Sequence, residues 1–240
     1  MRMYTKAGRS RWPYVIGGAV VVVAVAGGIV YSSAQPGGDP AAVASSEPTP
    51  SASAPSDGGS SGAGDDDGGV APTGCLGGQD RNAAMVLAAQ KAAKQTTYGA
   101  VEVATSFYRF LWQYPYPSAS ESETVSTAVM ADTATDVWKD IAGSYEAAGN
   151  DATQGVVPAG IPFHTSTTNG LWRVTENSTA DRVTVELAAG YVIDGALSAS
   201  KVAGIGLVMV WQNGVWQVES GTTVDQTKLA AGGNRYTGGC

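Results

Sequence analysis

The spacing of apolar side chains divides the chain into a continuous apolar run, a region without pattern, and an ordered C-terminal part. From Tyr14 to Tyr31 the sequence contains 18 residues without a charge. A helix of that length nearly crosses a hydrocarbon core of about 30 Å. The run therefore predicts a transmembrane helix over residues 13–31. A cleaved signal peptide is the alternative, because Ser32 and Ala34 form a small-x-small site just after the run, but the length of the run favours a retained anchor.

Helical spacing dominates the first half of the ordered part. Apolar side chains recur every three or four residues over residues 80–95, 100–114 and about 120–148, which predicts three helices. The third begins with a capping box formed by Ser120 and Glu123. In the second helix the polar residues Glu102, Arg109 and Gln113 fall outside the apolar stripe.

Beyond residues 149–162, which are rich in glycine and proline, the period changes to two. This alternation predicts strands over Leu171–Glu176, Arg182–Ile193, Ile205–Gln212 and Val215–Ser220.

Asn213-Gly214 is a strong signal for a two-residue hairpin turn. Such a turn places Trp211 opposite Trp216 and Met209 opposite Val218, so these four side chains share one face of the sheet. Helices followed by an antiparallel meander indicate an α+β fold with helices packed on one face of a curved sheet.

Composition and charge then predict a linker and the orientation of the chain across the membrane. Residues 32–79 are rich in Gly, Ser, Ala and Pro and contain no aromatic residue, which predicts a disordered linker between the membrane and a domain over residues 80–240. Residues 1–12 carry four basic and no acidic side chains, residues 32–79 carry six acidic and no basic ones, and residues 80–240 carry 10 basic and 15 acidic ones. The positive-inside rule therefore predicts a single-pass protein of the cell membrane, with a cytoplasmic basic tip and an extracytoplasmic domain. These charges argue against a free cytosolic enzyme and against nucleic-acid contact through the ectodomain.

Two cysteines flank the ordered part, since Cys75 precedes the first helix and Cys240 ends the chain. In an oxidising exported compartment this even count indicates a disulfide joining the two ends of the domain. Two unpaired or intermolecular thiols are the alternative. With a single histidine and two such distant cysteines, the chain has no ligand set for structural zinc, and we expect no cofactor.

The arrangement resembles a known architecture. A helix beginning TYGAVEVATSF (Thr97–Phe107), a second long helix and a meander closing on VMVWQNGVWQV (Val208–Val218) look like the cone-shaped fold of the nuclear transport factor 2 family. With a basic tip, one membrane helix and a tether ahead of this domain, the layout is similar to TcpC-like, VirB-type bitopic components of Gram-positive conjugative type IV secretion systems. The Gly- and Ala-rich composition suggests an actinobacterial source. The resemblance implies protein-protein assembly in a transfer channel and no catalytic residues.

Residues with chemical potential are few. His164 is the only side chain suited to proton transfer at neutral pH, and the candidate acids are Asp132, Asp136 and Asp194. We interpret His164 as a structural loop residue.

Aromatic residues are more informative than these polar candidates. Tyr108, Trp112 and Tyr114 lie at helical spacing, which is more typical of core than of a ligand site. Tyr114 and Tyr116 in the Tyr-Pro-Tyr-Pro segment, together with Trp112, are a candidate interaction surface.

Three functions follow in order of preference. The first is a membrane-tethered scaffold of a conjugative or related export machine, which is not an enzyme and contacts envelope or channel proteins, with homo-oligomerisation left open. The second is an exported domain that binds a small apolar ligand or an envelope lipid in the cone. The third is a cone-fold isomerase or hydrolase. A cone filled with side chains favours the scaffold, an open apolar cavity favours the binder, and a buried carboxylate beside His164 favours the enzyme.

Overall fold

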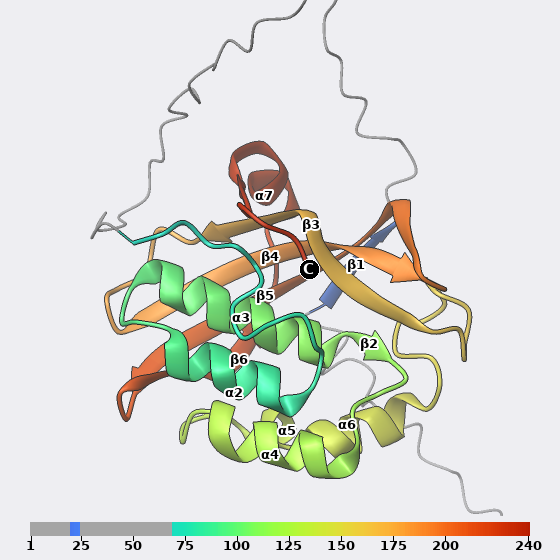
Figure 1. Ribbon diagram of the computed structural model, residues 1–240, viewed down its shortest axis with the longest axis horizontal. Coiled ribbons are helices and arrows are strands. Elements are labelled where there is room, and N and C mark those ends of the chain that lie inside the picture. The colour runs from blue at the N-terminus through green and yellow to red at the C-terminus, as the bar shows by residue number, and fades with distance from the viewer. Residues whose placement is uncertain (1–19, 25–68) are drawn as a thin grey trace, which may run out of the picture.

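The computed structural model describes Val20–Ala24 and residues 69–240. A curled antiparallel sheet wraps partly around helices that lie on its concave side (Figure 1). The strands run in the order β1-β5-β4-β3-β2, with β6 also paired to β5 and β7 also paired to β3. The strands are β1 (Val20–Ala24), β2 (Gln113–Tyr114), β3 (Phe163–Val174), β4 (Arg182–Ile193), β5 (Ala196–Gln212), β6 (Val215–Thr222) and β7 (Asn234–Arg235). The helices are α2 (Ala83–Ala92), α3 (Thr97–Leu111), α4 (Ala119–Val129), α5 (Asp136–Lys139), α6 (Ile141–Ala148) and α7 (Gln226–Gly232). The α+β class is therefore as the sequence indicates.

The hairpin of β5 and β6 has the register that a two-residue turn dictates. Trp211 lies opposite Trp216 and Met209 opposite Val218, and Asn213 and Gly214 both adopt the positive φ that such a turn requires. Met209, Trp216 and Val218 are fully buried, and Trp211 packs edge-on against Trp216 with ring centroids 5.4 Å apart. These side chains face the helices and form part of the core.

Helix α3 is the centre of the core. Its N-cap Thr96 accepts a hydrogen bond from the backbone N–H of Gly99, and Val103, Phe107 and Phe110 are fully buried against the sheet. The helix packs against the sheet on one side and against α2 on another, so almost all of its side chains are buried. The space inside the curl is therefore filled by side chains.

The predicted long helix over residues 120–148 is wrong, because the chain breaks into α4, α5 and α6. Met130 forms a parallel bridge with Val218, and the N–H of Ala131 donates to the carbonyl of Val218 at 2.8 Å. This pairing with β6 ends α4, and Asp140 later starts α6 as its N-cap. Val125 and Val129 of α4 and Ile141 of α6 are buried, and Trp138 of α5 packs partly buried against the core, so the apolar pattern of the sequence continues across the breaks.

The capping box of α4 also differs from the prediction. It is formed by Ser118 and Glu121 rather than by Ser120 and Glu123. Helix α4 therefore begins at Ala119, directly after its N-cap Ser118.

The predicted membrane segment is described only at Val20–Ala24. These residues form β1, which pairs antiparallel with β5, with Val22 opposite Ala203. Valine is β-branched and favours strands, and β5 extends beyond β6, so its edge at Lys201–Ile205 is open to a partner. No helix in the described parts of the chain is long and apolar enough to cross a membrane. The basic tip, the remainder of residues 13–31 and the linker up to residue 68 lie outside the described residues.

Candidate functional site

A disulfide joins the two ends of the ordered part. Cys75 and Cys240 are bonded although they lie 165 positions apart in sequence, and their Cα atoms are 5.7 Å apart, so the predicted pairing is confirmed. Backbone contacts support it, since the N–H of Thr237 donates to the carbonyl of Pro72 at 2.9 Å. The chain thus joins the domain by Pro72, ahead of the boundary at residue 80 that composition indicates.

Two buried charged residues of α3 hold this entering segment. The carboxylate of Glu102 accepts hydrogen bonds from the backbone N–H groups of Thr73, Gly74 and Leu76 and from the hydroxyl of Thr73. Glu102 is 8% exposed. Several N–H groups around one carboxylate satisfy a charge that burial would otherwise make costly.

Arg109, two turns further along α3, holds the next part of the segment. It is fully buried and donates to the carbonyls of Gly78 at 3.0 Å and Gln79 at 3.1 Å. Burial, followed by the positive charge of Arg81, lowers the pKa of Arg109 to about 10. Sequence reasoning missed the roles of Glu102 and Arg109 because the segment that covers them has no apolar pattern of its own. The available signal was that Glu102 and Arg109 are seven residues apart, which places both charges on the same face of one helix.

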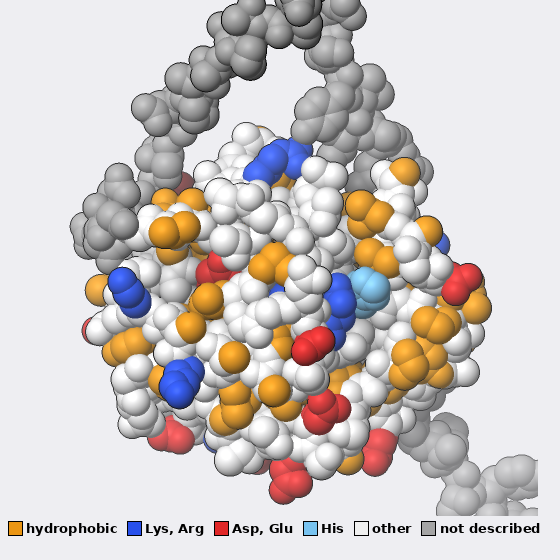
Figure 2. All heavy atoms as spheres, in the orientation of Figure 1, with side chains coloured by type: hydrophobic (Ala, Val, Ile, Leu, Met, Phe, Trp, Pro, Cys, Tyr) orange, Lys and Arg blue, Asp and Glu red, His pale blue; other side chains and the backbone are white. Residues whose placement is uncertain are grey.

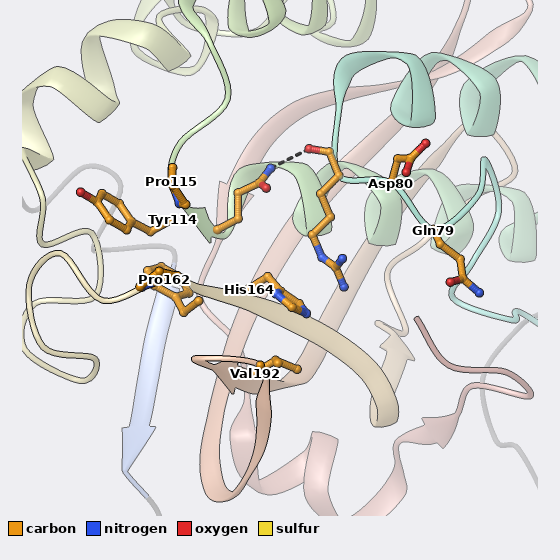
Figure 3. Close-up of a pocket in the computed structure, with 11 residues that line it drawn as sticks. Gln79, Asp80, Tyr114, Pro115, Pro162, His164 and Val192 are labelled. Carbon is orange, nitrogen blue, oxygen red and sulfur yellow. Dashed lines mark hydrogen bonds between the residues drawn. The ribbon is translucent and has the colours of Figure 1, made fainter.

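A pocket of about 420 Å³ opens where this segment meets the sheet. Its lining comes from residues 79–81 before α2, residues 113–115 around β2, residues 162–164 at the start of β3, and Val192 and Gly195 of the β4–β5 hairpin. In Figure 3 His164 lies next to Pro162 and above Val192, and Gln79 and Asp80 lie on the opposite side. The pocket therefore joins four segments that are far apart in sequence.

Arg81 is the cation of this pocket. Its Nη2 donates a single long hydrogen bond, 3.4 Å, to the carbonyl of Thr165, and its Nε is buried without a partner. No carboxylate among the described residues forms an ion pair with it. Gln113 fixes its backbone, since the Gln113 amide donates to the carbonyl of Arg81 at 2.7 Å. The backbone at Arg81 is thus held in place, while most donors of its guanidinium make no hydrogen bond within the described residues.

His164 stands beside this cation. It lies on β3, opposite Val192 on β4 and opposite Gln113 on β2, rather than in the loop that the sequence indicated. Burial, together with the positive charges of Arg81 and Arg109, lowers the pKa of His164 to about 4. The imidazole is therefore neutral at pH 7 and presents one N–H donor and one acceptor nitrogen.

The acidic residues considered as catalytic partners of His164 do not lie in the pocket. Asp132, Asp136 and Asp194 are exposed, and none of them lines the pocket. Asp80 is the pocket's acidic residue. In the part of the chain that the structure describes, no group of three His, Cys, Asp or Glu side chains is arranged to hold a metal ion.

The candidate aromatic surface is only partly exposed. The Tyr116 ring stacks on Tyr145 with centroids 4.4 Å apart and meets Tyr114 edge-on at 5.2 Å, so these rings cover one another over α6. Trp112 is buried, and its indole N–H donates to the hydroxyl of Tyr191 at 2.9 Å. Trp112 therefore belongs to the core, because the residue after α3 turns inward toward β4.

The surface around the pocket carries charges of both signs. In Figure 2 the histidine, pale blue, lies beside basic side chains, and an acidic side chain lies close below them.

Comparisons of the chain with protein-family models, with characterised proteins and with solved structures find no match.

Proposed function

We propose that this protein is a membrane-tethered extracytoplasmic scaffold of a conjugative, type IV secretion-like machine, built on a cone-shaped domain like that of nuclear transport factor 2. Residues 13–31 anchor it in the cell membrane, the linker sets its distance from the bilayer, and the domain contacts envelope or channel proteins. Its role is assembly rather than catalysis.

The observation that carries this proposal is the strand-accepting edge of β5. At Lys201–Ile205 this edge pairs over five residues with Val20–Ala24, which precede residue 69 by more than 40 positions in the sequence. An open edge presents unpaired N–H and C=O groups, and addition of an extended segment to such an edge is a common mode of protein recognition. The edge is therefore suited to a partner strand.

The valine run and the edge are coupled under this proposal. A helix within the bilayer and a strand on β5 each satisfy the backbone groups of residues 20–24, and the same residues cannot do both. Insertion of the run into the membrane therefore frees the edge of β5 for another protein. In the absence of insertion, β1 covers it.

Two further features support an exported scaffold. A disulfide between Cys75 and Cys240 is typical of proteins that fold in an oxidising compartment. The inside of the curl is filled by side chains such as Phe107, Tyr191 and Trp216, which favours a scaffold over a domain that encloses an apolar ligand.

Cysteine trapping tests the coupling. A Val22→Cys, Ala203→Cys pair places two thiols at directly opposite positions of β1 and β5. We expect no cross-link when the protein sits in native membranes, and a cross-link when the chain is extracted and the run is left without a bilayer. A quantitative cross-link in intact membranes would contradict the anchor.

A photo-reactive residue at Val202, on the edge of β5, tests the partner. We expect adducts to the same envelope or channel protein in each preparation. The matched control is a photo-reactive residue at Asn177, which is exposed in the β3–β4 loop. Equal capture from both positions, or only the lone monomer at Val202, would refute the scaffold role of the edge.

A further inference from the structure

The pocket beside α3 carries an inference that is independent of the β5 edge. We propose that it binds a small monocarboxylate with an apolar body, the carboxylate lying on Arg81 and the apolar body lying against Pro115, Pro162 and Val192.

The charge of the ligand follows from Arg81. This guanidinium lines the pocket, makes one hydrogen bond at 3.4 Å, and has no ion pair among the described residues. Its Nε is buried without an acceptor. A cation with unused donors at a partly buried site is stabilised by an anion, and the fork of an arginine matches the two oxygens of a carboxylate.

Neighbouring groups supply further donors. His164 is neutral at pH 7 because burial and two nearby guanidinium groups lower its pKa to about 4, so its ring offers one N–H donor. The side-chain amide of Gln79 lies on the other side of the pocket (Figure 3). Gln113 does not contact the ligand in this arrangement, since its amide donates to the carbonyls of Arg81 and Phe110. It is a positioning residue for Arg81.

A single negative charge fits better than two. Arg109, the second cation near His164, already donates to three backbone carbonyls, and Asp80 adds a negative charge to the lining. Residues 80–240 also contain more acidic than basic side chains, so the domain repels a dianion more strongly than a monoanion.

The walls and the volume set the rest of the ligand. Pro115, Pro162 and Val192 give the pocket a small apolar side, and its volume of about 420 Å³ lies at the small end of the range for ligand pockets. The site therefore accommodates a compact body, such as a single aromatic ring with a short chain, rather than a long lipid.

The only histidine in the chain reports on this pocket directly. We would label the full chain with ¹³C and ¹⁵N at histidine, hold it in non-ionic detergent, and follow the NMR chemical shifts of the His164 ring at pH 7. The probes are 3-phenylpropionate, its neutral isostere 3-phenylpropionamide, and 2-phenylethylphosphonate. We expect a saturable shift with the carboxylate, and binding of the amide weaker by about tenfold or more, because the charged contact to Arg81 is lost.

Variants separate Arg81 from a general charge effect. Arg81→Gln should weaken binding of 3-phenylpropionate about tenfold or more, and Arg81→Lys should give an intermediate loss because the charge remains without the fork. Lys91→Gln removes the same charge from an exposed position of α2 and should leave binding unchanged. An NMR spectrum with the chemical-shift dispersion of a folded protein in each variant shows that the domain is intact.

Three results would overturn the proposal. They are equal binding of the carboxylate and the amide, undiminished binding by Arg81→Gln, and the lack of any saturable shift up to about 20 mM ligand. Tighter binding of the phosphonate than of the carboxylate would also overturn the assignment of a monocarboxylate. None of these results bears on the β5 edge, so the scaffold proposal stands or falls separately.

Discussion

Removal of the disulfide is expected to cost this domain a large part of its stability, mainly through the unfolded chain. The bond closes a loop between two residues that lie 165 positions apart in sequence. In the chain-entropy model a loop of that length stabilises the folded state by about 5 kcal/mol. The folded state itself should change little, because Thr237 and Thr167 hold the two chain ends by hydrogen bonds of 2.9 Å to Pro72 and Cys240.

Urea denaturation of the Cys75→Ser, Cys240→Ser variant measures this effect. For a domain of this size the slope of free energy against urea is about 2 to 3 kcal/mol per molar, so we expect the midpoint to fall by about 2 M. Wild type treated with reductant should behave as the variant does. A midpoint shift below about 0.4 M, corresponding to about 1 kcal/mol, would refute the entropic argument.

A second substitution tests where the stabilisation resides. Glu102→Gln weakens the grip on residues 73–76 in the folded state, whereas loss of the disulfide acts on the unfolded chain. The two effects should therefore add within about 0.5 kcal/mol in a double-mutant cycle. If Glu102→Gln is silent once the disulfide is absent, the entering segment has left α3, and the disulfide acts on the folded state instead.

Three further predictions concern single side chains. Glu102→Gln should lower the free energy of unfolding by about 2 kcal/mol, because an amide N–H₂ faces backbone donors, whereas the exposed Glu146→Gln should change it by less than about 0.5 kcal/mol; equal effects in urea titrations would contradict the buried role. Ser118→Ala should cost about 1 kcal/mol as the loss of an N-cap, and Ser120→Ala should cost clearly less; the reverse order would place the cap where the sequence predicted it. For His164 the folded pKa of about 4 lies below the ordinary value of 6.5, so the unfolded chain binds more protons between these values and stability falls as the pH falls through this window. With solvent screening at a half-buried group, wild type should lose about 1 to 2 kcal/mol from this source between pH 7 and pH 4.5, and His164→Gln should not; an equal loss in both proteins would exclude the histidine as the cause.

Strands with strict alternation were predictable from the sequence, and strands without it were not. The limits of β4, Arg182–Ile193, follow from apolar residues at every second position. The first half of β3 escaped prediction because Thr165 to Thr168 carry no apolar alternation, although Thr165 and Thr167 are buried. Thr167 is covered by the C-terminal segment, since it exchanges hydrogen bonds with Cys240, and this is a long-range contact that no local pattern contains.

The pocket could not be predicted for a related reason. Its cation, Arg81, is one of several basic residues in a predicted helix, and nothing in its local sequence shows that it reaches Thr165 on β3. Gln113, which lines the pocket and bonds to the carbonyl of Arg81, was predicted outside the apolar stripe of the helix over residues 100–114, where solvent is the default expectation. Local periodicity identifies a core facing one side, whereas α3 is covered on a second side by the entering segment.

That entering segment links the disulfide, the tether and the pocket. The chain passes from the linker through Cys75, is gripped by Glu102 and Arg109, and then supplies Gln79, Asp80 and Arg81 as one wall of the pocket. A pull on the linker would first peel this segment from α3 if hydrogen bonds alone held it. The covalent bond to Cys240, whose N–H and carbonyl are tied to Thr167 on β3, carries that load into the sheet instead. The position of the disulfide therefore protects the pocket wall and the sheet from force applied to the chain ahead of Pro72, as the proposed membrane-tethered scaffold would require.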